Sequence, residues 1–219
     1  QYNVVEVTYF EAIGLAKSNL LEAFEDKEIP ASANLPKELV VRNKDGKIVG
    51  LATHFGYYGI AFNNTLAKAS DFQSWNDLTD ARWKGKLAVT RPVYATSYDL
   101  TILAHANGGS SAKIEPGIEP LKAIFANSLT TYTSLAHMNT LLTRGEVTAA
   151  PFYSTRVWSL RRDGQKTIEL AIPKEGALML PYVVVVPKGS AERAQTITYL
   201  NELLDAAAQT RISGQNGSI

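Results

Sequence analysis

Residues 74–90 read SWNDLTDARWKGKLAVT, a segment in which a helix start is followed directly by a strand. Ser74 is typical of an N-cap, because its hydroxyl can accept a hydrogen bond from the first turn of a short helix. Asp77 lies three positions further on, where a carboxylate can complete a capping box. The run from Lys86 to Thr90 then predicts a strand. A helix followed by a strand in this way is typical of an α/β fold.

The alternation of helices and strands continues on both sides of this segment. Residues 183–186 are all valine, which indicates a strand buried on both faces. The sequence therefore predicts an α/β class with a mostly parallel or mixed sheet. We expect helices at 11–24, 98–106, 118–125, 153–162 and 193–212 and from Ser134 onward, and strands at 4–8, 39–41, 48–53, 56–63, 146–150, 168–172 and 183–186.

The composition is that of an ordinary globular protein, with 219 residues of which 45% are hydrophobic and 20% are charged. The net charge of +1 gives no reason to expect nucleic acid as a partner. The sequence has no cysteine, which excludes disulfides and thiolate chemistry. No apolar run approaches the ~20 residues of a membrane span. The first residues, QYNVVEVTYF, lack the features of a signal peptide and indicate a strand.

The sequence gives little support for an enzyme. It has three histidines, and His105 and His137 lie in predicted helices, where packing or surface exposure is the usual role. The Gly-x-Ser-x-Gly, His-Glu-x-x-His and phosphate-loop motifs do not occur. We therefore expect neither catalysis nor a cofactor or metal.

Binding of a small molecule has better support, because hydroxyl pairs occur at three expected helix starts. These pairs are Thr96–Ser97, Thr133–Ser134 and Ser154–Thr155. Each can simply cap its helix, or hydroxyls and free N–H groups can together hold an anion. Arg91 directly follows the expected strand 86–90, and Arg156 lies just after Ser154. Arginine can grip a carboxylate or phosphate through two parallel hydrogen bonds, although Arg156 can equally be a surface charge.

Aromatic residues also gather at the expected strand ends. A single tyrosine there usually packs, but repetition at several ends fits an aromatic-lined pocket for a small ligand. The residues concerned are Tyr9, Phe10, Tyr57, Tyr58, Tyr94, Phe152, Tyr153 and Tyr182.

Four segments in order along the chain resemble the extracytoplasmic solute-binding proteins of ABC importers. They are SWNDLTDARWKGKLAVT, GYYGIAFNN, LLTRGEVTAAPFYSTRVWSLRRDG, and the long segment from IELAIPKEG to NELLDAAAQ. The branches that the chain resembles most are those for polyamines, ferric iron, and phosphate- or phosphonate-bearing solutes.

The resemblance implies a type II periplasmic binding protein fold, in which two α/β lobes joined by crossover strands close on a ligand. Residues 1–57 and 180–219 would form the first lobe, and residues 58–179 the second. The family also has an N-terminal strand–helix unit and C-terminal helices that this sequence lacks, so we expect a partial first lobe of a longer protein. The implied partners are a small-molecule ligand and a membrane permease. The implied location is the periplasm, and we expect a monomer.

The resemblance also assigns ligand contacts by position. The segments that carry them are VTYF, GYY, TRPVYATS, TYTS, FYSTR and LPY. The expected contacts are Thr8, Tyr9, Phe10, Tyr57, Tyr58, Arg91, Tyr94, Thr96, Ser97, Thr133, Ser134, Phe152, Tyr153, Arg156, Pro181 and Tyr182.

Departures from the family pattern favour an anionic ligand. Polyamine binders carry carboxylates where this chain has Arg91–Pro92 and residues 180–182, LPY. Ferric binders carry adjacent tyrosines where this chain has Phe152–Tyr153, so one phenolate is lost, although Tyr57, Tyr58 or Tyr94 could replace it. A phosphonate, a sugar phosphate or a carboxylated amino-acid derivative is therefore the first choice, and ferric iron is the alternative. A ligand-sensing domain of a regulator or receptor can share the fold and is a further alternative.

Overall fold

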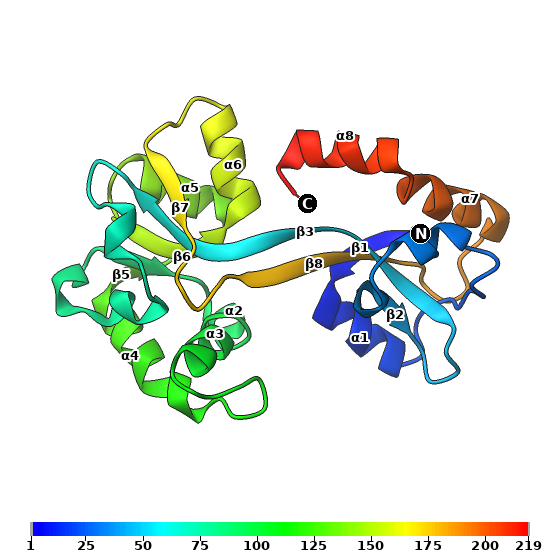
Figure 1. Cartoon of the computed structure of the whole chain (residues 1–219), viewed down its shortest axis with the longest axis horizontal. Coiled ribbons are helices and arrows are strands. Elements are labelled where there is room, and N and C mark those ends of the chain that lie inside the picture. Colours follow the sequence, from blue (N-terminus) through cyan, green and yellow to red (C-terminus); the bar gives the residue numbers. More distant parts are fainter. Residues whose placement is uncertain (1, 219) are drawn as a thin grey trace. The chain divides into compact units, whose positions relative to one another are not determined.

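The chain runs through two separate units and passes between them inside two long strands. The computed structural model describes residues 2–218. Unit 1 is Gln1–Gly56 with Leu180–Ile219, and unit 2 is Tyr57–Met179. The strands that belong to both units are β3 (Ile48–Asn63) and β8 (Leu178–Val185) (Figure 1).

Unit 1 is built on four strands in the order β1-β8-β3-β2. One buried cluster includes Phe24, Ile48 and Leu200, and a second includes Val41, Val183 and Val185. The valine strand 183–186 is therefore buried, as its sequence predicts. The remaining elements of this unit are β1 (Val5–Thr8), α1 (Tyr9–Lys17), β2 (Val40–Arg42), α7 (Arg193–Leu203), α8 (Ala206–Asn216) and two 3-10 turns, Pro30–Asn34 and Lys37–Leu39.

Unit 2 has five strands in the order β7-β3-β6-β4-β5, because β6 and β7 pair with the same part of β3. Helices α3 and α4 lie on one side of this sheet, and α5 and α6 lie on the other (Figure 1). The α/β class predicted from the sequence is confirmed. The elements are β4 (Leu87–Val89), β5 (Ser128–Thr131), β6 (Ala149–Tyr153), β7 (Ile168–Ala171), α2 (Pro92–Ala95), α3 (Asp99–Ala106), α4 (Ile118–Asn127), α5 (Leu135–Thr143), α6 (Ser154–Arg162) and 3-10 turns at Ala69–Asp71, Trp75–Thr79, Ala81–Trp83 and Glu115–Gly117.

The capped turn at the start of residues 74–90 is confirmed. Ser74 Oγ accepts a hydrogen bond from the backbone N–H of Asn76 at 3.2 Å, and the Ser74 N–H donates to Asp77 Oδ2 at 2.8 Å. The turn leads into β4, which is fully buried. This strand carries Arg91 just beyond its end, at the edge where the candidate site lies.

The predicted helix over residues 11–24 is too long. Helix α1 ends at Lys17, and Asn19 then adopts a left-handed conformation with φ 55°. Leu21 and Phe24 are buried through isolated bridges to Pro187 and Ile48 rather than on a helix face. Their helical spacing is therefore coincidental, because an extended chain buries the same side chains.

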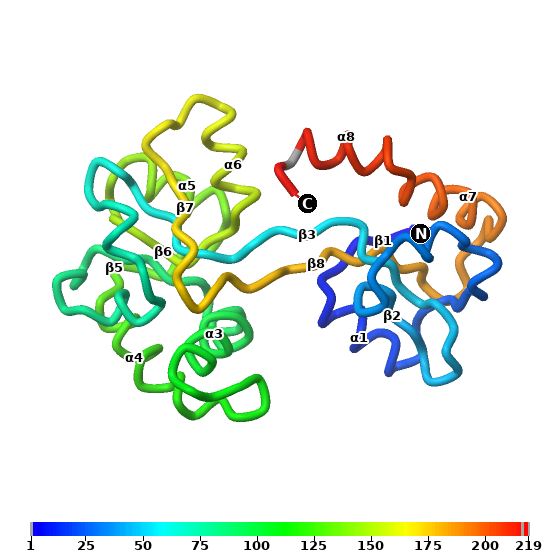
Figure 2. The backbone as a smooth tube through the Cα atoms, viewed as in Figure 1, coloured from blue at the N-terminus to red at the C-terminus, as the bar shows by residue number. Residues whose placement is uncertain are grey.

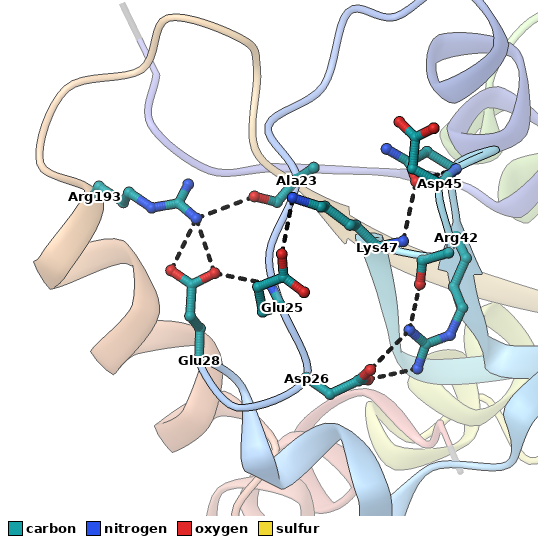
Figure 3. Close-up of polar contacts among 10 residues, drawn as sticks. Ala23, Glu25, Asp26, Glu28, Arg42, Asp45, Lys47 and Arg193 are labelled. Carbon is teal, nitrogen blue, oxygen red and sulfur yellow. Dashed lines mark hydrogen bonds and ion pairs between the residues drawn. The ribbon is translucent and has the colours of Figure 1, made fainter.

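Ion pairs hold this irregular segment against its neighbours (Figure 3). Arg42 donates two hydrogen bonds to Asp26, at 2.6 and 3.3 Å, and lowers the pKa of that carboxyl. Lys47 lies 2.8 Å from Glu25, and Arg193 donates to Glu28 at 2.9 Å. These pairs are largely exposed, so each adds little stability and their main effect is to fix the path of the chain.

The predicted helix over 193–212 is instead two helices, α7 and α8, with Asp205 between them. Figure 2 shows that the tube changes direction from one helix to the other. The Asp205 carboxylate accepts hydrogen bonds from the N–H groups of Ala207 and Ala208, at 2.8 and 3.4 Å. It thereby starts a new helix within a continuous apolar pattern. None of the helices in the described part of the chain is long and apolar enough to cross a membrane.

Two strand predictions in unit 2 also differ from the structure. The strand predicted at 146–150 is β6 at Ala149–Tyr153, because Gly145 (φ 67°) and the residues after it still close the turn of α5. Strand β5 was not predicted at all. Its sequence, SLTT, is half-exposed and too polar to give a strand pattern.

Candidate functional site

The carboxyl ends of three neighbouring strands meet at one edge of the unit 2 sheet. β4 runs parallel to β5 on one side and to β6 on the other. Arg91 follows β4, Thr133 and Ser134 follow β5, and Arg156 follows β6 in the first turn of α6. In open α/β sheets, ligands bind beyond this end of the strands. The topology therefore brings polar residues from three distant parts of the chain to the same edge.

Arg91 and Arg156 are the two arginines of unit 2 that form no ion pair within residues 2–218. Both are exposed. The Arg91 guanidinium lies over the ring of Tyr94, with its Cζ 5.2 Å from the ring centroid. A fixed positive charge at each of two strand ends is thus available to an anion. The other arginines of this unit, Arg82, Arg144, Arg161 and Arg162, each pair with a carboxylate.

A cluster of four tyrosines, Tyr58, Tyr94, Tyr98 and Tyr153, extends inward from Arg91. The ring of Tyr94 stacks on Tyr98 at 6.0 Å between centroids. Tyr98 meets the edge of Tyr58 at 5.4 Å, and Tyr58 meets Tyr153 at 5.2 Å. Tyr58 and Tyr98 are buried, whereas Tyr94 and Tyr153 keep partial exposure. This tyrosine cluster forms a connected set of aromatic rings that begins beside Arg91.

The hydroxyl pair after β5 begins α5 as predicted. Ser134 Oγ accepts a hydrogen bond from the N–H of His137 at 3.1 Å, which makes it the N-cap. The Thr133 N–H donates to His137 Nδ1 at 3.3 Å. Both residues are exposed at the strand edge. The capping role is therefore present, and a contact with ligand stays a prediction.

Thr96 and Ser97 do not begin a helix, which corrects the interpretation of this pair. Pro92 starts α2, and Thr96 lies at the end of that helix. The Thr96 hydroxyl donates to the carbonyl of Pro92 at 3.0 Å, and the Ser97 hydroxyl donates to that of Val93 at 3.1 Å. The hydroxyls thus face helix carbonyls. They do not join an N-terminal anion site.

Three aromatic residues of the predicted set have mainly packing or backbone roles in the structure. Phe152 has no exposed surface and lies in the core cluster beside α5 and α6, and Tyr58 is equally buried. Tyr57 is half-buried, and its N–H donates to Ser154 Oγ at 2.8 Å. Phe152 and Tyr58 therefore pack against the partly exposed ring of Tyr153.

In unit 1 the predicted residues lie at the junction of β1 and α1. Thr8 is the N-cap of α1, and its hydroxyl and N–H both donate to Glu11 Oε2, at 2.7 and 2.8 Å. The Tyr9 hydroxyl donates to the Glu38 carbonyl at 2.8 Å, and Phe10 is 48% exposed. The hydroxyls of Thr8 and Tyr9 are therefore engaged in holding the helix start.

Pro181 and Tyr182 lie in β8, where Tyr182 pairs in register with Thr8. The Tyr182 ring stacks on His54 at 4.9 Å between centroids. His54 Nδ1 lies 3.8 Å from Glu6 Oε2. Burial lowers the pKa of His54, and the Glu6 carboxylate partly opposes that effect. His54 was not among the predicted site residues.

Asp99 is the most unusual ionisable residue in unit 2, and the sequence did not single it out. It is 4% exposed at the start of α3, and the Tyr58 hydroxyl lies 3.3 Å from each carboxylate oxygen. Burial raises the pKa of Asp99 from its ordinary 3.8 to about 7. Burial also raises the pKa of Tyr58 well above its ordinary value. An acid in the first turn of a helix is so common that no sequence signal marks this one.

No group of three or more His, Cys, Asp or Glu side chains that could hold a metal ion occurs among residues 2–218. The arrangement at the unit 2 edge has fixed cations, hydroxyls and aromatic rings. These groups can bind and orient a small molecule.

Comparison with known proteins gives a consistent result. Residues 12–218 match the family model described as bacterial extracellular solute-binding protein. A periplasmic protein of Salmonella typhimurium whose name refers to 2-aminoethylphosphonate binding is 27% identical over 163 residues, or 72% of this chain and 47% of that protein. The chain thus spans about half the length of this curated relative.

Solved structures agree on the fold. The spermidine/putrescine-binding protein PotD of Streptococcus pneumoniae matches with a TM-score of 0.81 at 15% identity, over 99% of this chain and 67% of that one. Iron-bound HitA of Pseudomonas aeruginosa matches with a TM-score of 0.73 at 19% identity, over 99% and 68%. The predicted periplasmic binding protein fold and extracytoplasmic location are confirmed. The chain belongs to the bacterial extracellular solute-binding protein family.

Proposed function

We propose that this protein is the substrate-capturing component of an ABC importer and that its solute is a small organic anion. The observation that carries the proposal is the pair of exposed arginines, Arg91 and Arg156, which have no carboxylate partner within residues 2–218. Both lie at the carboxyl edge of the unit 2 sheet, where ligands of open α/β sheets bind. A phosphonate, a sugar phosphate or a carboxylated amino-acid derivative has the matching charge.

The chemistry of the edge suits such a solute. A guanidinium can donate two parallel hydrogen bonds to a phosphonate or carboxylate, at about 2.7–2.9 Å. The hydroxyls of Thr133 and Ser134 and the start of α5 add neutral donors and a partial positive charge. Tyr94 and Tyr153 offer rings to the non-ionic part of the solute, as in other small-molecule sites.

Two other solute classes fit the edge less well. A polyamine would place ammonium groups beside two arginines that have no carboxylate partner within residues 2–218, which is unfavourable. Ferric iron would favour phenolate ligands, but Tyr58 is fully buried, which leaves the partly exposed Tyr94 and Tyr153 as the tyrosines of the cluster that could reach a metal ion. A trivalent cation there would also meet the charges of the two arginines. The relatives named for polyamines and iron therefore share the fold without predicting this solute.

The proposal is tested by a thermal-shift screen of the purified chain. The panel contains 2-aminoethylphosphonate, a sugar phosphate, an opine-type acid, spermidine and ferric citrate. A solute at a hundred times its Kd stabilises the folded state by about 2.7 kcal/mol, which is a rise in Tm of about 5 to 10 °C. We expect such a rise from at least one organic anion. A rise from spermidine or iron alone would refute the proposal.

Variants then connect the solute to the edge. Arg91→Ala and Arg156→Ala should each weaken binding roughly 10- to 100-fold, because each removes charge-assisted hydrogen bonds. Arg144→Ala is the matched control, since Arg144 is exposed in the same unit but lies 3.8 Å from Glu146. Its affinity should equal that of the wild type.

A further inference from the structure

The proposed anion site has a buried acid behind it. Asp99 lies directly behind the tyrosine cluster, since its carboxylate accepts the Tyr58 hydroxyl at 3.3 Å and its chain neighbour is Tyr98. Tyr58 in turn touches the rings of both Tyr98 and Tyr153. One carboxyl group therefore fixes the ring at the centre of the cluster.

The surroundings of Asp99 offer it no countercharge. The titratable groups that interact with it are Tyr58 of β3, whose hydroxyl donates to its carboxylate, and Tyr132 after β5. Tyr98 before α3 and Tyr153 of β6 pack around Tyr58. Within residues 2–218, no lysine, arginine or histidine forms an ion pair with it. An anion that binds at Arg91 offsets the positive charge that lies over Tyr94, and Asp99 has no ion-pair partner within residues 2–218 that would counter this change.

We propose that Asp99 is a positioning residue of the tyrosine cluster and takes up one proton when an anionic solute binds beside that cluster. The inference rests on the proposed function, because it takes the solute to be an anion held by Arg91. The proton comes from solvent and bonds to a carboxylate oxygen, and no other bond changes. The Tyr58 hydroxyl keeps its contact, since a carboxylic acid still has an acceptor oxygen.

The physical reason is repulsion between two negative charges across a region of low dielectric. The raised pKa of about 7 places Asp99 where a modest added charge changes its protonation near neutral pH. Arg91, the proposed anion ligand, is two ring contacts away, through Tyr94 at 5.2 Å and Tyr98 at 6.0 Å. At a separation of about 10 Å and an effective dielectric of about 20, the repulsion raises the pKa of Asp99 by about one further pH unit. Affinity should then fall about fivefold between pH 6 and pH 8.

The test is calorimetric titration of the wild type and Asp99→Asn with 2-aminoethylphosphonate, at pH 6, 7 and 8. Two buffers with different ionisation enthalpies give the number of protons taken up. A phosphonate itself titrates near neutral pH, so the measured quantity is the uptake of the wild type beyond that of the variant. Asp163→Asn, which changes an exposed acid of the same unit, is the control and should match the wild type.

We expect an excess uptake of about half a proton between pH 7 and pH 8, because a rise of the pKa from about 7 by about one unit changes the protonated fraction by no more than that. We also expect a flatter pH profile in Asp99→Asn. Binding with equal uptake in both proteins, or with excess proton release in the wild type, would overturn the inference and leave the proposed function standing. Failure of the wild type to bind the phosphonate or any other anion of the panel would overturn both. Infrared spectroscopy of the free wild type adds a check, because a protonated carboxyl band that titrates near neutral pH is required.

Discussion

The burial of Asp99 makes a quantitative prediction about how stability depends on pH. The pKa of this carboxyl is about 7 in the folded chain and 3.8 when it is exposed. Between these values the folded state holds more protons than the unfolded state, so stability falls as pH rises from about 4 to about 7 and is then constant. The full penalty above pH 7 is about 4 kcal/mol, because each pH unit between the two pKa values contributes about 1.36 kcal/mol.

Asp99→Asn removes this titration while keeping an acceptor for Tyr58. The free energy of unfolding of the variant minus that of the wild type should therefore increase by about 2 to 3 kcal/mol between pH 5 and pH 8. Using the change between two pH values cancels any constant cost of the new amide N–H groups. It also cancels the titration of all other groups.

The assay is urea unfolding followed by tryptophan fluorescence. Trp75, Trp83 and Trp158 all lie in unit 2, so the signal reports on the unit that contains Asp99. Asp163→Asn is the control, since it removes an exposed acid paired with Arg162 and should follow the wild type at every pH. A difference between Asp99→Asn and the wild type that is the same at pH 5 and pH 8 would refute a buried carboxyl with a raised pKa.

Three further changes test how the two units are built. Asp205→Ala should lower the stability of α8 by about 1 kcal/mol, because the helix loses its N-cap. Amide hydrogens in the first turn of α8 should then exchange roughly fivefold faster, and an unchanged exchange rate would contradict two separate helices. Gly117→Ala should cost about 2 to 3 kcal/mol in urea unfolding, because a Cβ there would lie 2.6 Å from the backbone atoms Ala104 N and Leu100 O. Gly14→Ala, with nothing within 4 Å of its new Cβ, should instead stabilise α1 by about 0.5 to 1 kcal/mol, as measured by circular dichroism on denaturation.

The sequence is informative about unit 2 where local rules and tertiary structure agree. Arg91 is expected to be a site residue because its charged side chain stands just beyond the buried strand β4, and its contact with a ligand stays a prediction. The Ser134 cap could be predicted because the hydroxyl precedes a helical apolar pattern. Pro92 also carries a sequence signal, because proline favours the first turn of a helix and so places Thr96 and Ser97 at the end of α2.

Other features depend on packing that no local pattern reveals. In the sequence, Asp99 is an ordinary acidic residue in the first turn of a helix. Its burial depends on side chains such as Tyr58, which a distant strand contributes. Leu21 and Phe24 have helical spacing but are buried by an extended chain. The end of the long C-terminal helix was missed because Asp205 interrupts a continuous apolar pattern without a glycine or proline.

The central claim is that the unit 2 edge binds an organic anion through Arg91 and Arg156, and the affinity of the double variant tests it most directly. Titration of 2-aminoethylphosphonate, or of whichever anion of the panel binds, is compared between the wild type and Arg91→Ala/Arg156→Ala. We predict loss of at least about a hundredfold in affinity, from two charge-assisted contacts of about 1.5–3 kcal/mol each. An affinity equal to that of the wild type would contradict the claim.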